Sequence, residues 1–307
     1  MIEIRSVTMC FHSYDSRRTQ TVLDGLTMTI PSGCVFGLVG PNGTGKSTLL
    51  RLLAGVYAPG SGDILLDGVP VWDNPDVKSR ISFIPDDLLY SREADMKQLA
   101  RHARRINPRF SPERFASLAA QFGLETDKPL RTFSKGMKRQ AALVLALAEM
   151  PDVLLLDETF DGFDPVVRNH VRQLLFAEVM DRDMTVVTAS HSLRELENTC
   201  DRLAILDGGH VLYETDMDAV QSSLCKVQTA FPEARGAAFY EGLGLAPLSL
   251  EQEGTVTTMI LRMDCAEAEA VLRAQNPILL NVLPLDLEEI FTFELEKTGY
   301  AVRNLLV

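Results

Sequence analysis

Short apolar runs alternate with stretches of helical spacing over the first 220 or so residues of the chain. Such alternation is typical of an α/β fold with parallel core strands. The turn Asp207-Gly208-Gly209 predicts a hairpin from the last of these runs into residues 211–213. The apolar runs that we expect to be strands are 34–39, 63–67, 81–84, 153–156, 185–189 and 203–206.

Two regions depart from this alternation. Residues 88 to about 150 carry mainly helical spacing, which predicts a helical subdomain with helices at 96–106, 112–122 and 135–150. After residue 220 the pattern predicts a small α/β module over 221–307, with strands at 255–262 and 278–283 and helices at 265–274 and 287–297. We therefore expect one domain over 1–220 and an accessory module over 221–307.

Composition narrows the classes of protein. With 307 residues, 46% of them hydrophobic, the chain is globular and long enough for more than one core. Its formal net charge of −12 disfavours nucleic acid as a partner. The longest apolar run, 141–148, is too short to span a membrane, so any membrane role requires a partner. The first five residues alternate like a strand and lack the pattern of an export signal, so we expect a cytoplasmic protein.

Cysteine and histidine add no candidate metal or disulfide framework. The five cysteines are odd in number and scattered, and the five histidines are equally dispersed. We expect all the cysteines to be buried thiols, since no paired spacing indicates a zinc site or a disulfide. They are Cys10, Cys34, Cys200, Cys225 and Cys265.

A glycine-rich loop between a buried strand and a helix is the strongest chemical signal. Glycines let successive backbone N–H groups point at an anion, and the positive end of the helix dipole adds to the attraction. Lys46 is expected to reach the β- and γ-phosphates of a nucleotide, and Ser47 to bind Mg²⁺. The loop consists of Gly40, Pro41, Asn42, Gly43, Thr44, Gly45, Lys46, Ser47 and Thr48.

Two carboxylates follow the apolar strand at 153–156. Ligands of open α/β sheets bind at the carboxyl ends of the strands, and this strand resembles a Walker B motif. Asp157 is then expected to hold Mg²⁺, and Glu158 to act as general base toward a water molecule. Such a pair alone is often only a solvated loop, but next to a phosphate loop we favour the catalytic interpretation.

Ser134 precedes an apolar helix and is expected to cap it, with hydroxyl and backbone N–H groups available to an anion. The other interpretation is an ordinary cap with solvated lysines. The Ser-x-Gly pattern of Ser134 and Gly136 lies between the phosphate loop and the strand that is followed by two carboxylates. In this order of motifs the chain resembles an ATP-binding-cassette (ABC) ATPase. The resemblance implies a P-loop NTPase fold of ABC type, a mixed sheet with an inserted helical subdomain. It also implies that two subunits pack head to tail around ATP.

Three further segments resemble this family in the expected order. The segment from Asp161 to Pro165, which contains Asp164, resembles the D-loop that links the two sites. Ser190-His191 resembles the switch histidine, which implies that His191 contacts the γ-phosphate and the attacking water. Near the start, Phe11 resembles the aromatic residue on which adenine stacks, with Tyr14 as the alternative.

The chain also departs from the family pattern. Asp86 stands where a glutamine is usual, and we expect it to bind Mg²⁺ with altered coupling. Lys135 and Met137 replace a glycine and a glutamine of the signature, and Thr159 replaces a proline. Because the lysine of the phosphate loop, both carboxylates and the histidine are present, we predict a site that hydrolyses ATP.

A single phosphate loop without membrane spans or coiled-coil arms indicates a nucleotide-binding subunit that serves separate permease subunits and pairs with a second ABC ATPase subunit, identical or different. Leu88, Leu89 and Tyr90 are expected either to receive a helix of the permease or to be buried within the subdomain. The protein would then lie on the inner face of the cell membrane. The alternative is a soluble ATP-driven switch without a membrane partner.

The end of the chain bears on the subgroup. Residues 284–291 resemble an ending found in ABC-2 type ATPases, a largely export-linked group. The other interpretation is an amphipathic helix with an aspartate cap and buried Leu287, Ile290 and Phe291.

Overall fold

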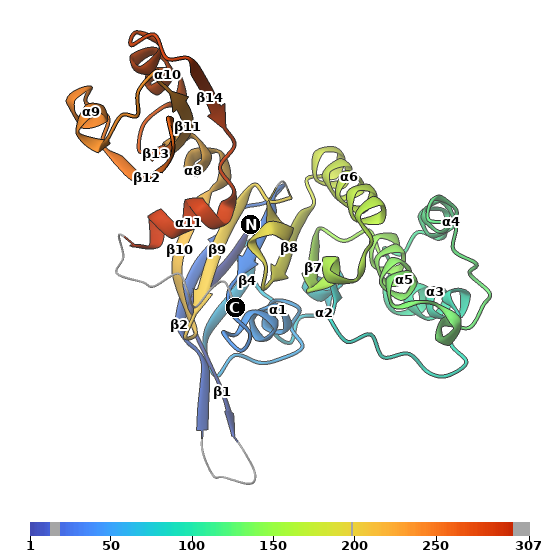
Figure 1. Cartoon of the computed structure of the whole chain (residues 1–307). Coiled ribbons are helices and arrows are strands. Elements are labelled where there is room, and N and C mark those ends of the chain that lie inside the picture. Colours follow the sequence, from blue (N-terminus) through green and yellow to red (C-terminus); the bar gives the residue numbers. More distant parts are fainter. Residues whose placement is uncertain (13–18, 198, 297–307) are drawn as a thin grey trace. The chain divides into compact units, whose positions relative to one another are not determined.

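The computed structural model describes residues 1–12, 19–197 and 199–296. The chain divides into two compact units, Met1–Glu214 and Thr215–Val307 (Figure 1). The division falls a few residues before the boundary that we expected at 220. Among the described helices, none combines the length and apolar character needed to cross a membrane.

A six-stranded sheet forms the centre of the first unit. Parallel pairing joins β9 to β3, β3 to β8, β8 to β7 and β7 to β6. Every residue of β3, β7 and β8 is buried, as expected for parallel strands covered on both faces. The order is β10 (His210–Asp216), β9 (Arg202–Asp207), β3 (Val35–Val39), β8 (Thr185–Ser190), β7 (Val153–Asp157) and β6 (Ile81–Ile84). The bounds of these strands agree with the predicted bounds to within a few residues.

A second sheet of four antiparallel strands belongs to the same unit, in the order β2 (Thr19–Ile30), β1 (Ile2–His12), β4 (Ser61–Leu66) and β5 (Val69–Pro70). Only β4 and the start of β1 were expected from the sequence. β2 escaped prediction because it alternates between exposed and buried positions only over its last residues. One apolar core joins this sheet to the six-stranded sheet and includes Ile4, Leu26, Phe36 and Leu50.

Helices α1 (Lys46–Leu53), α2 (Pro75–Lys78), α6 (Pro165–Arg182) and α7 (Leu193–Leu196) connect these strands, with short 3₁₀ turns η1 (Leu130–Thr132) and η2 (Thr159–Gly162). The predicted helical subdomain is present as α3 (Met96–Ile106), α4 (Pro112–Gln121) and α5 (Lys135–Ala148), which lie side by side in Figure 1. Each begins at a side-chain cap, in which Asp95, Ser111 and Ser134 accept a backbone N–H from the first turn.

The second unit is built on an antiparallel sheet in the order β12 (Pro247–Glu253), β13 (Val256–Leu261), β11 (Cys225–Ala230) and β14 (Leu279–Leu283). Its helices are α8 (Met217–Ser223), α9 (Ala237–Gly242), α10 (Cys265–Arg273) and α11 (Leu287–Glu296). The sequence predicted β13, β14, α10 and α11 but not the remaining elements. At the start of α11, Asp286 accepts the N–H of Glu289 at 2.7 Å, and Leu287, Ile290 and Phe291 are buried, which confirms the amphipathic helix.

The prediction of five free thiols is wrong for one pair. Cys225 and Cys265 form a disulfide, with Cα atoms 5.0 Å apart and a sequence separation of 40. Cys225 pairs with Leu261 at the end of β13, and α10 begins at Cys265 shortly afterwards. The antiparallel pairing of β11 with β13 therefore brings together two cysteines whose spacing carries no signal. The free thiols are Cys10, half-buried, and Cys34 and Cys200, both buried.

Candidate functional site

The phosphate loop connects β3 to α1. Gly45 has φ +104 and stands before Lys46 without any side-chain cap, so the first N–H groups of α1 are not taken by a cap. A Cβ at Gly45 would come 2.6 Å from Leu23, so both the conformation and the space require glycine. The strand, the bare helix start and the glycines together make a cradle for an anion.

Lys46 is folded back onto this loop. It is 5% exposed, and its Nζ donates to the carbonyls of Gly40 at 2.5 Å and Pro41 at 3.0 Å. Burial lowers the pKa of Lys46, while the carboxylates of Glu158 and Asp157 act in the opposite direction. A bound polyphosphate would place full negative charges beside the Lys46 ammonium. The loop carbonyls that it contacts in this structure carry only partial negative charges.

Ser47 and Asp157 meet directly. The Ser47 hydroxyl donates to Oδ1 of Asp157 at 2.8 Å, and Asp157 is 1% exposed at the end of β7. Its Oδ2 is buried and has no hydrogen-bond partner within the described residues. Burial is the main cause that raises the pKa of Asp157. A buried carboxylate oxygen without a partner, next to a hydroxyl, is a donor set that fits Mg²⁺.

Glu158 and His191 lie at the ends of adjacent strands. The Nδ1 atom of His191 is 2.9 Å from Oε2 of Glu158. A carboxylate oxygen accepts hydrogen bonds, so Nδ1 of His191 is the donor in this contact. The backbone pairing of β7 with β8 extends to Glu158, because its N–H donates to the Ala189 carbonyl at 3.0 Å. The two predicted catalytic residues are therefore neighbours.

A hollow of about 340 Å³ opens beside the phosphate loop and Glu158. It joins the phosphate loop to both Glu158 and Asp86, as the motifs indicated. Gln20 and Val22 of β2 also face it, and neither was predicted as a site residue because β2 itself was not predicted. The lining residues are Gln20, Val22, Asn42, Gly43, Gly45, Lys46, Ser47, Thr48, Asp86 and Glu158.

Phe11 lies close to one side of this hollow. It pairs with Gln20 across β1 and β2, is 38% exposed, and meets the Tyr57 ring edge to face at 5.8 Å between centroids. The alternative candidate, Tyr14, is outside the described residues. An exposed aromatic face near a nucleotide-sized hollow is available for stacking on a base.

The signature and D-loop residues do not line the hollow within the described part of this single chain. Ser134 accepts the N–H of Met137 at 3.2 Å, so the predicted cap is confirmed. Asp164 caps α6 by accepting the N–H groups of Val166 and Val167, each at 3.0 Å. A Cβ at Gly136 would come 2.9 Å from the Gly162 carbonyl, so the signature and the D-loop pack tightly against each other.

Asp86 has a partner that was not predicted from the sequence. Its Oδ1 accepts a hydrogen bond from Arg139 of α5 at 2.6 Å. Arg139 is 2% exposed although it is charged. A signal was present: Arg139 shares helical spacing with the buried Ala142, Leu143 and Ala146, so it occupies the apolar face of its helix.

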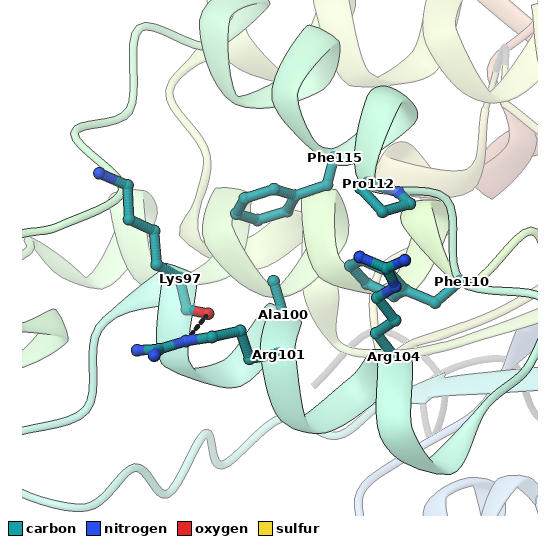
Figure 2. Close-up of a pocket in the computed structure, with 7 residues that line it drawn as sticks. All are labelled: Lys97, Ala100, Arg101, Arg104, Phe110, Pro112 and Phe115. Atoms are coloured by element: carbon teal, nitrogen blue, oxygen red, sulfur yellow. Dashed lines mark hydrogen bonds between the residues drawn. The ribbon is translucent and has the colours of Figure 1, made fainter.

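A separate hollow of about 460 Å³ lies in the helical subdomain, away from these motifs (Figure 2). Its lining comes from α3, the start of α4 and the segment between them. Basic side chains stand beside two aromatic rings there, and none of the residues belongs to a predicted motif. They are Lys97, Ala100, Arg101, Arg104, Phe110, Pro112 and Phe115.

Comparison with known proteins decides the family. Residues 23–161 match the family described as ABC transporter. The ABC transporter ATP-binding protein YtrB of Bacillus subtilis (strain 168) is 34% identical over 291 residues, which are 95% of this chain and 97% of that protein. The chain belongs to the ABC transporter family. Over 255 residues this ABC ATPase is also 32% identical to the daunorubicin/doxorubicin resistance ATP-binding protein DrrA of Streptomyces peucetius, covering 79% of this chain and 76% of that protein.

A solved structure shows the same fold. The ATP-binding cassette MJ0796, in a dimeric post-hydrolysis state bound to ADP and Pi, superposes with a TM-score of 0.64 at 20% identity and covers 71% of this chain and 99% of that chain. The predicted fold and the predicted role as an ATP-hydrolysing subunit of a transporter are confirmed. The alternative of a soluble switch without a membrane partner is not favoured.

Proposed function

We propose that this ABC ATPase drives export through separate integral-membrane subunits, with the phosphate-loop hollow as its hydrolytic site. The observation that carries the proposal is the contact between Glu158 and His191 at the rim of a hollow that also exposes the phosphate loop. A carboxylate and an imidazole in contact are the groups needed to orient and deprotonate a water molecule.

Each residue has a defined task in hydrolysis. The N–H groups of the phosphate loop and Lys46 bind the β- and γ-phosphates, and Phe11 stacks on adenine. Glu158 accepts the proton of the attacking water, while His191 holds that carboxylate and contacts the γ-phosphate.

Ser47 and Asp157 would hold Mg²⁺, which neutralises charge that develops on the phosphates. The buried Oδ2 of Asp157 supports this assignment. Asp86, at the edge of the same hollow, was predicted as a further ligand, but one of its oxygens is already bound to Arg139.

Ser134, Gly136 and Asp164 act on the nucleotide of a second subunit. In this chain the Ser134 and Asp164 side chains cap helices, and Gly136 allows close packing because it has no side chain. None of the three lines the hollow among the described residues. The Ser134 hydroxyl accepts one N–H of the first turn, that of Met137, and the positive end of the α5 dipole still favours an anion held by a partner. ATP would thus join two such subunits, identical or different, and hydrolysis would release them.

The membrane partner docks beside β6 and α5. Leu89 is 94% exposed, and Leu88 and Tyr90 are half-buried next to it. The three line a hollow of about 280 Å³ together with Pro85 and residues of α5 that include Ala142 and Leu145. An exposed leucine above a mostly apolar hollow suits a short helix from a permease subunit. Through this contact the protein lies on the inner face of the cell membrane.

The relatives favour export. One is a drug resistance ATP-binding protein, and another is the Nod factor export ATP-binding protein I of Rhizobium meliloti (strain 1021), 34% identical over 220 residues. The ABC-2 type ending at residues 284–291 agrees with this group. The transported compound is not encoded in the subunit that supplies energy.

Affinity purification from membranes tests the proposal. The tagged wild type should bring down a polytopic membrane protein, and Leu89→Asp should lose it while its basal ATP hydrolysis stays unchanged. Ile106→Asp is the matched control, since Ile106 is 83% exposed on α3 and does not line the 280 Å³ hollow. Capture of no membrane protein by the wild type, or equal capture by all three proteins, would contradict the docking proposal.

A further inference from the structure

One guanidinium connects three parts of the catalytic region. The Nη1 atom of Arg139 donates to the carbonyl of Glu158 and, at 3.0 Å, to the carbonyl of Thr159. The Nη2 atom donates to Oδ1 of Asp86 at 2.6 Å. Arg139 on α5 thus holds the segment after β7, which carries the catalytic glutamate, and the segment after β6.

Glu158 needs such a support. It has φ +47, a left-handed conformation that is unfavourable for a residue other than glycine. This conformation persists only where the surroundings impose it, and Arg139 binds the carbonyl of this same residue. The turn determines where the Glu158 carboxylate points, so the guanidinium also determines how it meets His191.

The space around Arg139 is fitted to the side chain. A Cβ at Gly162 would come 2.7 Å from Cδ and 3.0 Å from Nε of Arg139. Gly162 has no positive φ in the structure, so the close approach of Arg139 is what requires glycine here. The D-loop glycine therefore leaves room for the arginine to reach the two carbonyls.

Burial makes the partnership with Asp86 necessary. A charge buried at 2% exposure is tolerated only when it is paired and hydrogen-bonded. Asp86 is the carboxylate paired with Arg139, and the Asp86 side chain itself is 52% exposed. The aspartate at the usual glutamine position thus supplies the counter-charge that an amide would not.

We propose that Arg139 is a positioning residue for ATP hydrolysis, which fixes the turn of Glu158, and that Asp86 acts mainly as its counter-ion. The proposal rests on the proposed hydrolytic role of Glu158. On this proposal an aspartate stands at position 86 because the buried Arg139 requires a negative charge, and not because the metal requires a ligand. A lysine at position 139 would keep the charge but lose the planar fork that reaches two carbonyls and a carboxylate at once.

The test measures hydrolysis, nucleotide affinity and Mg²⁺ dependence of the full chain. Arg139→Met should lower kcat about 100-fold, as expected for a misplaced catalytic group, with ATP affinity nearly unchanged. Arg139→Lys should fall between Arg139→Met and the wild type. Asp86→Asn should lower kcat by a smaller factor, and the double variant Arg139→Met/Asp86→Asn should match Arg139→Met, because Asp86 acts through the arginine.

Two controls isolate the effect. Asp87→Asn removes the neighbouring exposed carboxylate, and Arg101→Met removes an exposed arginine of α3; both should hydrolyse ATP like the wild type. Asp86 is half-exposed, so Asp86→Asn keeps the proposal testable even if the buried substitution prevents folding, which circular dichroism reports.

Clear outcomes overturn the inference. A wild-type kcat for folded Arg139→Met would contradict positioning by Arg139. A raised Mg²⁺ requirement in Asp86→Asn, with effects of the two substitutions that multiply in the double variant, would make Asp86 a metal ligand instead of a counter-ion. Failure of the proposed function is distinct, since there the wild type would hydrolyse no ATP or Glu158→Gln would hydrolyse it at the wild-type rate.

Discussion

The imidazole of His191 lies 2.9 Å from the carboxylate of Glu158, although the two residues are separated by more than thirty positions in the chain. The adjacent parallel strands β7 and β8 end at Asp157 and Ser190. Glu158 and His191 are the next residues along the chain. The Ser190 hydroxyl, next to His191, donates to Glu195 at 2.8 Å and fixes the turn after β8. The sheet therefore delivers both groups to one edge without any long loop.

Removal of the imidazole should slow hydrolysis and leave binding intact. We predict that His191→Ala lowers kcat about 100-fold, within the range for loss of a group that orients a catalytic base. The apparent affinity for a fluorescent ATP analogue should change little, because the phosphate loop provides most of the contacts. His102→Ala, at an exposed position of α3, is the matched control and should behave like the wild type. Full activity of His191→Ala would show that the contact has no catalytic role.

Asp157 should destabilise the metal-free protein at neutral pH. Burial raises its pKa in the folded state, so between the unfolded and the folded pKa the folded state binds more protons. The free energy of unfolding then falls as pH rises through that window, and the penalty is complete above it. Asp157→Asn removes the charge and should raise Tm without Mg²⁺, measured by differential scanning calorimetry at pH 7.

The same variant should lose its response to metal. Adding Mg²⁺ with ATP should raise Tm of the wild type more than that of Asp157→Asn. Asp161→Asn, at an exposed position, serves as control for the loss of a carboxylate near the site. A lower Tm of metal-free Asp157→Asn than of the wild type would contradict the assignment of Asp157 as a strained, buried charge.

The Cys225–Cys265 disulfide should be detectable chemically and should stabilise the second unit. Alkylation of the unfolded, unreduced chain should modify the three free cysteines, and alkylation after reduction all five. Closing a loop with a sequence separation of 40 is worth about 4 kcal/mol in the chain-entropy account. Cys225→Ser should therefore lower the unfolding midpoint of the second unit, while Cys10→Ser, which removes a half-buried thiol, should leave it unchanged. Five reactive thiols without reduction would contradict the disulfide.

The sequence predicts the catalytic strands and motifs well because each is local. The phosphate loop, Asp157 with Glu158, and His191 each follow a short apolar strand, and parallel strands with covered faces read as continuous apolar runs. The ends of α3 at Met96 and Ile106 were also predicted correctly. A local pattern predicts a helix or strand correctly where the spacing of its apolar residues and the residues at its ends indicate the same element.

What escaped prediction depends on contacts between distant segments. The disulfide requires the pairing of β11 with β13, which the spacing of its cysteines does not reveal. The role of Arg139 requires that the helix after Ser134 turn this residue toward Glu158 and Asp86. β2 was missed because its first residues are mostly exposed and show no regular alternation. Only its last residues alternate between exposed and buried positions.

ATP-dependent dimerisation of Glu158→Gln, followed by light scattering, tests the central claim most directly. The amide cannot accept the proton of the attacking water, so ATP should remain bound and hold two subunits together. Glu233→Gln, at an exposed position, is the matched control. The account predicts a stable dimer of Glu158→Gln with ATP but not with ADP, and no lasting dimer of the wild type or the control. Hydrolysis by Glu158→Gln at the wild-type rate would contradict the account, and a monomer saturated with ATP would contradict the pairing of two identical subunits.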